Sequence, residues 1–385
     1  MNIIYLGVFP PNFLIKRSDG KIDSLYRTSE AIIYGFRCIP NVNLHVITSP
    51  DIPSWPKGPL FVSHENNDEE KLTMVSSLNL SFIKQFWTIL SMTIDASRII
   101  RKTEGKTVVM IPHLVFRHVF TLRLLHFLYP QKVVQASIVP DIFFPKKWFS
   151  RQINSFTEYL SSKFDAFVLY TSKMADYLKL SKVRCIVIEG FRKVPDYKPR
   201  SSNEFKIIYA GSLNINYGVG RLVEAMSYID DPEIQLHLYG SGSAENLITT
   251  AAKKDGRISF FGKVPHTVAT DAIYSASALI NPRNANDGDY TEYSFPSKDI
   301  EYMATGIPAL LCKLPGMPPE YYGHFVDIGD GTPNQIAEAI VRIKKMTKEE
   351  RFSIGKDARD FILSRMDSIE QVKSIVSLFE RVLDM

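Results

Sequence analysis

The chain alternates short apolar runs, rich in β-branched residues, with longer stretches whose apolar residues recur every three to four positions. The runs predict buried strands and the stretches predict amphipathic helices, and their alternation is typical of parallel α/β units. In the first half the expected strands are Ile3–Val8, Leu44–Thr48, Thr107–Ile111, Lys132–Ala136, Ala166–Tyr170 and Cys185–Ile188. The expected helices are Ser24–Cys38, Leu80–Lys102, Phe116–Leu128, Phe149–Lys163 and Lys173–Lys179.

Residues 191–204 interrupt this pattern with two prolines, mixed charge and no apolar period, which predicts a linker. The alternation then restarts. The expected strands are Lys206–Ala210, Gln235–Tyr239, Ile258–Phe261, Ala278–Ile280, Ala309–Leu311 and Phe325–Asp327. The expected helices are Val219–Ser227, Thr267–Ser275, Lys298–Ala304 and long helices to the end. The predicted fold class is therefore α/β, with two Rossmann-like domains facing across a cleft, because such sheets bind ligands at the carboxyl ends of their strands.

Composition fits this picture and charge adds to it. The 385 residues are 45% hydrophobic and 23% charged, as expected for two globular domains. Residues 1–200 hold 27 Lys and Arg against 16 Asp and Glu, whereas the remainder has a net charge of −6. The basic half makes an anionic membrane surface a candidate partner, with a solvated surface as the alternative. Nucleic acid is not expected, because the basic residues are dispersed and no nucleic-acid motif is present.

The sequence predicts a cytoplasmic protein that is soluble or lies on the inner face of a membrane. The first residues, Met1–Gly7, are typical of a strand and not of a signal peptide. The apolar stretch 78–100 is interrupted by charged residues and is not expected to span a bilayer. The three cysteines have neither metal-ligand spacing nor the even number of a disulfide framework, which favours buried thiols in a reducing compartment.

A short expected helix after Pro296 carries the most informative chemistry. Ser297 is expected to cap it, and its first N–H groups form an anion site to which Lys298 adds a charge. Glu301, one turn later, can accept hydrogen bonds from vicinal hydroxyls such as those of a ribose. Gly306 is expected to end the helix in a left-handed cap. The alternative is an ordinary capped helix with a solvated glutamate.

These residues resemble the donor-binding segment of the family-four glycosyltransferases with the GT-B fold, in the bacterial branch with Phe-Pro-Ser-Lys ahead of Glu-Tyr-Met-Ala-Thr-Gly-Ile-Pro, here residues 295–298 and 301–308. Further segments resemble strand ends of the same domain. They are Tyr209–Leu213 with Tyr217–Val219 and Leu222–Ala225, Leu238–Gly242, and Phe260–Val264. The resemblance covers residues 205–345 by motif and the N-terminal half only in layout.

The resemblance implies a retaining glycosyltransferase of surface polysaccharide biosynthesis that needs no metal and no other cofactor. It would move a sugar from a nucleoside diphosphate sugar to a saccharide or lipid-linked saccharide. Residues 1–190 would form the acceptor-binding domain and 205–365 the nucleotide-sugar-binding domain. The final segment, 366–385, would be a helix that packs back on the N-terminal domain.

The resemblance also implies roles for single residues. Glu301 would hold the ribose, Ser297 and Lys298 would meet the diphosphate, and backbone near Lys263 and Val264 would contact the base. Four more residues complete the expected binding site for the nucleotide sugar. They are Gly211, Ser212 and Gly240 at two strand ends, and the cation Arg283.

The chain departs from the family pattern at three positions. The family commonly has Arg where this chain has Ser212 and Lys where it has Tyr217, and these two cations cradle the diphosphate. Arg283 and Lys298 are the natural substitutes. The family's first acidic residue falls on Tyr293, with Glu292 one position away, so a role for that glutamate stays open.

Other candidates are weaker. His113 and Asp141 each follow an expected strand in the N-terminal domain and are candidate catalytic residues that orient the attacking hydroxyl or stabilise charge on the sugar. The aromatic and basic segment 143–149 is a membrane-surface candidate, with burial as the alternative. The apolar face of the helix at residues 80–102 is best explained by core packing.

Rival interpretations come from other classes of protein. The segment Gly240-Ser241-Gly242 lacks the third glycine of a dinucleotide fingerprint, because Glu245 stands there. Asp287-Gly288-Asp289 resembles a metal-binding Asp-x-Asp, but a turn-rich loop is the preferred interpretation. A catalytically silent nucleotide-binding subunit, a nucleotide-sugar epimerase and a phosphorylase remain alternatives to the transferase.

Overall fold

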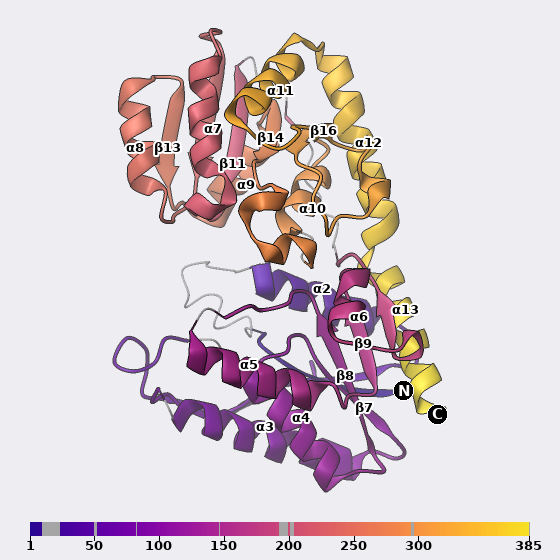
Figure 1. Ribbon diagram of the computed structural model, residues 1–385. Helices are drawn as coiled ribbons and strands as arrows, with labels where there is room; N and C mark the ends of the chain where they lie inside the picture. The colour runs from indigo at the N-terminus through magenta and orange to yellow at the C-terminus, as the bar shows by residue number, and fades with distance from the viewer. Residues whose placement is uncertain are drawn as a thin grey trace. The chain divides into compact units, whose positions relative to one another are not determined.

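The computed structural model describes residues 1–9, 24–49, 52–81, 83–145, 147–191, 199–200, 204–293 and 296–384. This part of the chain falls into two compact units (Figure 1). The N-terminal unit comprises Met1–Lys193 with Met366–Met385, and the C-terminal unit comprises Val194–Arg365. Most of the expected linker lies outside the described residues.

The N-terminal unit is built on a largely parallel sheet with the strand order β10-β9-β8-β7-β1-β2-β5-β4. Only β4 runs antiparallel to its neighbour, β5. The strands are β1 (Asn2–Gly7), β2 (Asn43–Thr48), β4 (Glu65–Asn67), β5 (Leu72–Met74), β7 (Thr107–Ile111), β8 (Val133–Val139), β9 (Ala166–Leu169) and β10 (Cys185–Val187). The central strands β7 and β8 are buried along their whole length, which explains their continuous apolar runs.

The sequence did not predict the short strands between β2 and α3. A separate antiparallel pair joins β3 (Phe61–Val62) to β6 (Ser77–Leu78), and β4 and β5 extend the edge of the main sheet. These strands are two or three residues long, and all of β4 is exposed. No apolar alternation of useful length therefore marks them.

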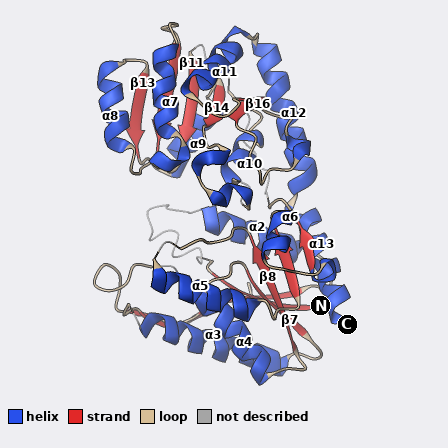
Figure 2. Ribbon diagram, viewed as in Figure 1, coloured by secondary structure: helices blue, strands red, loops and turns tan. Residues whose placement is uncertain are grey.

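Helices cover both faces of this sheet (Figure 2). One layer holds α3 (Ile83–Lys102), α4 (Phe116–Leu128) and α5 (Trp148–Ser161), in which α4 packs against both others. Because the chain moves in one direction from β7 to β9, right-handed crossovers place these helices on the same face. The other face carries α2 (Ser24–Cys38), and α6 (Ser172–Tyr177) follows β9.

The last helix, α13 (Ser368–Leu383), packs against α2, β9 and β10 within the N-terminal unit. Gly35 of α2 allows this close approach, because a Cβ there would lie 2.5 Å from the carbonyl oxygen of Ser368. The rings of Phe36 and Phe379 stack across the same contact with centroids 6.4 Å apart. The C-terminal end of the chain thus contributes to the core of the first unit.

The prediction that core packing explains the apolar face of α3 is wrong. Phe86, Leu90 and Ile94 are exposed, whereas Met92 and Ala96 form the buried side of the helix. The helix carries apolar residues on both sides, and periodicity alone did not show which side faces the sheet.

The C-terminal unit has a fully parallel sheet with the order β13-β12-β11-β14-β15-β16. The strands are β11 (Phe205–Ala210), β12 (Ile234–Tyr239), β13 (Ile258–Gly262), β14 (Ala278–Asn281), β15 (Ala309–Leu311) and β16 (Val326–Asp327). The helices are α7 (Val219–Ala225), α8 (Glu245–Lys254), α9 (His266–Tyr274), α10 (Ser297–Met303), α11 (Pro333–Lys345) and α12 (Lys348–Met366).

Helix α8 was not predicted. Within it only Ile248 is buried, and its remaining residues are mostly polar or small, so its apolar stripe is too narrow to stand out in the sequence. It contacts α7 and β13, and α7 in turn contacts α11, so these three helices share one face of the sheet.

Within the ranges given above, no helix combines the length and the apolar composition needed to cross a bilayer.

The cysteine prediction needs a correction. Cys38 is exposed and Cys185 is partly buried, so that among these thiols only Cys312 is buried as expected. All three are free thiols.

Candidate functional site

Three neighbouring strands of the C-terminal sheet end in glycines. Gly211, Gly240 and Gly262 follow or end β11, β12 and β13, and each has a positive φ. The Gly211 N–H donates to the Tyr239 carbonyl at 2.9 Å, and the Gly240 N–H donates to the Gly262 carbonyl at 2.8 Å. A Cβ on Gly240 would overlap the Gly211 carbonyl oxygen. The strand ends therefore meet backbone to backbone, at the edge where parallel sheets bind ligands.

Helix α10 starts beside this edge of the sheet, but its N-terminal cap differs from the prediction. Pro296 in an extended conformation is the N-cap residue, and no side chain caps the helix. The prediction that Ser297 caps it is therefore wrong. Ser297 is an exposed first residue of the helix, and Gly306, with φ at 82°, adopts the expected left-handed conformation after its end.

Lys298 joins α10 to the end of β11. Its Nζ donates a hydrogen bond to the Ala210 carbonyl and lies 5.0 Å from the ring centroid of Tyr209. A Cβ on Gly211 would overlap this Nζ. Tyr302 strengthens the connection, because its hydroxyl accepts a hydrogen bond from the Ala210 N–H at 2.9 Å. The predicted pair of Lys298 and Gly211 is thus brought together.

A buried carboxyl group, that of Asp299, lies close enough to Lys298 and Arg283 to feel their charges, and sequence reasoning missed it. Asp299 accepts a hydrogen bond from the Asn281 amide at 2.6 Å. Burial raises the pKa of Asp299 to about 6, while the hydrogen bond and the charges of Arg283 and Lys298 act in the opposite direction. The sequence did hold a signal: Asp299, Tyr302 and Met303 share one face of α10 at helical spacing, and all are buried.

Arg283 lies over the ring of Tyr217, one of the positions at which the chain departs from the family pattern. Its guanidinium carbon is 4.0 Å from the ring centroid of Tyr217, a cation–π contact. The expected second cation is therefore held at the residue that replaces the family's lysine. Ser212, the other replaced position, is exposed, and its carbonyl accepts a hydrogen bond from the Tyr209 hydroxyl at 2.7 Å.

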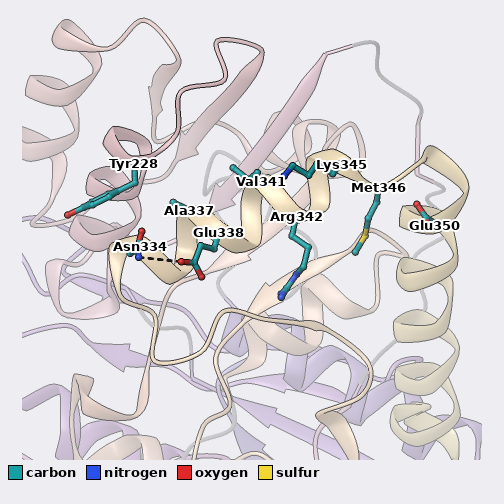
Figure 3. Close-up of a pocket in the computed structure, with 9 residues that line it drawn as sticks. All are labelled: Tyr228, Asn334, Ala337, Glu338, Val341, Arg342, Lys345, Met346 and Glu350. Carbon is teal, nitrogen blue, oxygen red and sulfur yellow. Dashed lines mark hydrogen bonds between the residues drawn. The ribbon is translucent and has the colours of Figure 1, made fainter.

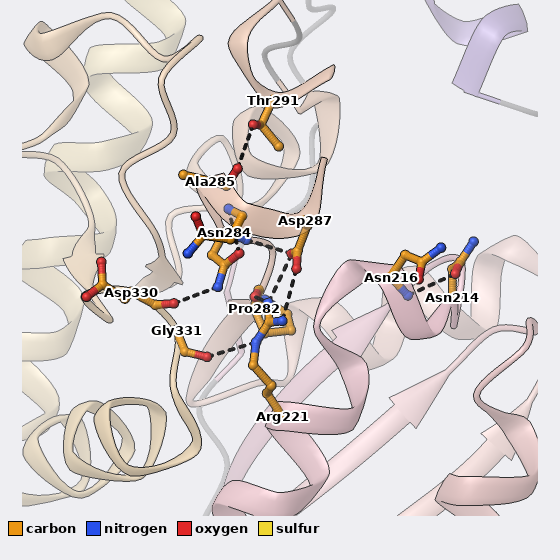
Figure 4. A network of polar contacts seen from close by, with 11 residues as sticks. Asn214, Asn216, Arg221, Pro282, Asn284, Ala285, Asp287, Thr291, Asp330 and Gly331 are labelled. Atoms are coloured by element: carbon orange, nitrogen blue, oxygen red, sulfur yellow. Dashed lines mark hydrogen bonds and ion pairs between the residues drawn. The ribbon is translucent and has the colours of Figure 1, made fainter. Parts of the chain in front are cut away.

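A polar network orders the loop after β14 (Figure 4). Arg221 donates to both carboxylate oxygens of Asp287, at 2.9 and 3.0 Å, and to the carbonyls of Pro282 and Gly331. Asp287 also accepts from the Asn284 N–H at 2.8 Å. Asp287 therefore fixes the loop that follows Arg283, in keeping with the preferred turn interpretation. Among the residues that the structure describes, no group of three His, Cys, Asp or Glu side chains is placed to hold a metal ion.

The remaining predicted donor residues lie on the same unit. Glu301 is partly buried one turn into α10, and the exposed Lys263 and partly buried Val264 follow directly after Gly262. Just before them, the ring of Phe261 stacks on that of Tyr239 with centroids 4.5 Å apart. Both residues belong to segments that carry the family resemblance, but their contact was not predicted.

A hollow on the surface of α11 does not belong to this site (Figure 3). Its lining comes mainly from α11, including Asn334, Glu338 and Arg342, and contains no residue of α10 or of the glycine strand ends.

The two candidates of the N-terminal unit share one edge of its sheet. His113 follows β7 and Asp141 follows β8, and these strands are parallel neighbours. Asp141 is exposed, and its Oδ1 accepts from the Ile142 N–H at 2.9 Å. Burial lowers the pKa of His113 to about 4, so the imidazole is neutral near pH 7.

The lowered pKa of His113 gives a prediction for stability against pH. The unfolded chain binds a proton near pH 6.5 and the folded chain only near 4, so stability falls as the pH drops through this window. At pH 5 we expect wild type to have lost about 2 kcal/mol more than His113→Gln, relative to pH 7.5. Urea unfolding of both proteins at both pH values measures this difference. The raised pKa of Asp299 changes stability with the opposite sign, but it is present in both proteins and cancels in the comparison. Equal losses of stability in wild type and His113→Gln would contradict the prediction.

With this geometry established, comparisons with known proteins define the class. Residues 204–345 match the family model described as glycosyl transferases group 1. Among solved structures, sucrose-phosphate synthase from Thermosynechococcus elongatus is 16% identical with a TM-score of 0.67, covering 99% of this chain and 100% of its own. A trehalose-6-phosphate synthase, OtsA, is 9% identical with a TM-score of 0.68 and 98% coverage of both chains. The lipopolysaccharide outer core galactosyltransferase WaaB is 16% identical with a TM-score of 0.60, covering 100% of this chain and 99% of its own.

No curated protein matches the sequence.

The protein is a glycosyltransferase with the GT-B fold. Its C-terminal unit carries a group 1 glycosyl transferase domain, which extends over the glycine strand ends, Arg283 and α10. The resemblance to family-four glycosyltransferases is confirmed, and so is the predicted α/β class with two Rossmann-like domains.

Proposed function

We propose that the protein is a retaining glycosyltransferase that takes a sugar from a nucleoside diphosphate sugar and transfers it to a saccharide or lipid-linked saccharide. The bond between the anomeric carbon and the diphosphate oxygen breaks, and the acceptor hydroxyl oxygen forms the new bond on the same face. The nucleoside diphosphate leaves and takes up the proton of the hydroxyl. Surface polysaccharide biosynthesis on the inner side of the membrane is the setting we propose.

The observation that carries the proposal is the position of Lys298. Its ammonium group lies at the end of β11 beside Gly211, and only glycine at that position leaves room for it, because a Cβ there would overlap the lysine Nζ. Arg283 adds a second cation near the same strand ends, held against Tyr217. Two cations at the first turn of the sheet match the charge of a diphosphate and would stabilise the leaving group without a metal ion.

The other roles follow from this placement. We propose that Glu301 binds the ribose hydroxyls and that the base lies near Lys263 and Val264. Ser297, Ser212 and Gly240 complete the surroundings of the diphosphate. One related solved structure, TarM from S. aureus, holds UDP, and this supports a nucleotide at the corresponding site here. On the N-terminal unit, His113 and Asp141 remain the proposed catalytic residues.

The proposal predicts a defined loss for Glu301→Ala. Removing charge-assisted hydrogen bonds to the ribose should weaken nucleotide binding by about 1.5–3 kcal/mol, or roughly 10- to 150-fold in Kd. Calorimetric titration with UDP, GDP and ADP measures it. Glu338→Ala is the matched control, since Glu338 is exposed on α11 and hydrogen-bonds only locally, to Asn334. Equal affinities for Glu301→Ala and wild type would remove this glutamate from the site.

A catalytically silent nucleotide-binding subunit is the second candidate, and the replacement of two family cations by Ser212 and Tyr217 favours it. Incubating the protein with a panel of nucleotide sugars separates the two. Release of nucleoside diphosphate supports the transferase. Binding without release from any of the panel, with or without added saccharide acceptors, supports the silent subunit.

A further inference from the structure

The layer formed by α3, α4 and α5 exposes many large apolar side chains. Phe86 on α3 is 72% exposed, Phe127 on α4 is 79% exposed and Trp148 on α5 is 72% exposed. Each helix contributes several more. The exposed set, called the apolar face below, consists of Ile83, Phe86, Trp87, Leu90 and Ile94 on α3, Phe120, Phe127 and Leu128 on α4, and Trp148, Phe149, Ile153, Phe156 and Tyr159 on α5.

The spacing shows that these side chains point away from the sheet. On α3 they recur at positions 83, 86, 87, 90 and 94, a single helical stripe, while Met92, Ala96 and Ile100 bury the opposite side. On α4 the exposed Phe120 and Phe127 lie opposite the buried Leu122 and Leu125. The three stripes therefore face outward together, because the buried sides of their helices are all turned inward to the same sheet.

Ring contacts join the stripes of α4 and α5. Phe116 at the start of α4 lies 5.6 Å from Phe120 and 6.4 Å from Phe156 of α5, measured between ring centroids. Helix α3 packs along α4. Monomeric proteins rarely expose large apolar patches, and those that they do expose often mark sites of binding.

The charges on the helices of the apolar face are mostly positive. On α3 the stripe continues directly into Arg98 and Arg101, and beyond α5 the ammonium group of Lys163 lies 5.5 Å from the Tyr159 ring centroid. Within α3, α4 and α5, all of which the structure describes, the acidic residues are Asp95 and Glu158. Asp95 is buried and paired with His64 and Arg98, and Glu158 accepts from Asn154 and Tyr177.

We infer that the apolar face docks the protein onto an anionic bilayer surface. Trp, Phe and Tyr insert at the boundary between headgroups and acyl chains, and the surrounding Lys and Arg attract anionic headgroups. A second copy of the chain fits less well, because symmetric pairing would bring these cations against identical cations. The inference deepens the membrane setting of the proposed function, because it names the surface that contacts lipid, and it does not depend on the identity of donor or acceptor.

The test is flotation of the full chain with lipid vesicles, one set of phosphatidylcholine alone and one that also contains phosphatidylglycerol. Wild type should float with the anionic vesicles, less so as salt is raised, and weakly with the neutral ones. The triple variant Phe86→Ser, Phe127→Ser and Trp148→Ser should lose about tenfold or more of its partitioning, because its substitutions remove exposed aromatic area from the bilayer interface. All three residues are exposed, so an unchanged thermal unfolding midpoint is expected.

Two further variants make the result specific. Phe352→Ser removes a Phe that is 61% exposed on α12 of the other unit, and it should bind vesicles as wild type does. Arg101→Glu with Lys163→Glu should reduce binding to the anionic vesicles alone, by about tenfold. This double variant tests the charges separately from the aromatic residues. The inference therefore stays testable even if the triple variant fails to fold.

Several results would overturn the inference. One is no flotation of wild type with either vesicle, and another is flotation of the triple variant at the wild-type level. A dimer of wild type that the triple substitution dissociates would assign the apolar face to a second copy. Sugar transfer to a soluble saccharide is measured in the same preparations. Transfer without vesicle binding would overturn the membrane inference alone and leave the proposed function standing.

Discussion

Lys298→Ala should reduce the rate of sugar transfer about 100- to 1,000-fold, the range found when a group that stabilises transition-state charge is removed. The lysine ammonium group is held at the end of β11 by the Ala210 carbonyl and faces the position of Gly211. An alanine would leave Arg283 as the remaining cation of the proposed diphosphate site. The reaction is followed by release of nucleoside diphosphate from the donor that the panel identifies.

Binding measurements sharpen this prediction. Lys298→Ala should weaken binding of a nucleoside diphosphate much more than binding of the corresponding nucleoside, because the lost contact is with the diphosphate. Lys356→Ala is the control, since this exposed lysine of α12 pairs with Asp360 on its own helix. Equal losses for nucleoside and diphosphate would contradict the assignment of Lys298.

Gly240→Ala should destabilise the C-terminal unit by about 3 kcal/mol or more and abolish donor binding with it. The backbone of Gly240 has φ at 132°, a conformation that other residues rarely adopt, and an added Cβ would overlap the Gly211 carbonyl oxygen. The neighbouring strand end must then shift, and it carries the backbone on which Lys298 is anchored. Urea unfolding of the full chain, followed by circular dichroism, measures the loss.

Gly256→Ala is the matched control in the same unit. Gly256 has an ordinary φ, and a Cβ there meets nothing within 4 Å. Substitution should leave stability within about 0.5 kcal/mol of wild type or raise it slightly, because alanine restricts the unfolded chain. If both variants unfolded at the same urea concentration as wild type, the close packing of the strand ends would not be the reason for glycine at position 240.

Much of the fold was open to prediction because its signals are local. Strands such as β7 and β8 are buried on both faces, so they appear as continuous apolar runs, and helices α2 and α4 begin and end at the predicted residues. Helix α8 and strands β3 to β6 were missed, since short or mostly polar elements leave no periodic trace.

The candidate site divides in the same way. The residue types at its strand ends and along α10 were visible as motifs, because each strand with its glycine, and likewise the Pro-Ser-Lys turn, is contiguous in the chain. The contacts of these residues were not visible in the sequence. The contacting pairs, which are separated by 18 to 88 residues, are Asn281 with Asp299, Tyr217 with Arg283 and Ala210 with Lys298.

The sequence by itself determined the α/β class, the glycosyltransferase resemblance and a short helix with a lysine and a glutamate one turn apart, for which we propose donor binding. Tertiary structure alone decided which side of α3 is buried, which carboxylates are paired and where the two cations stand. The physical reason is that periodicity reports on one helix or strand at a time, whereas burial and electrostatics depend on neighbours that only folding brings into contact.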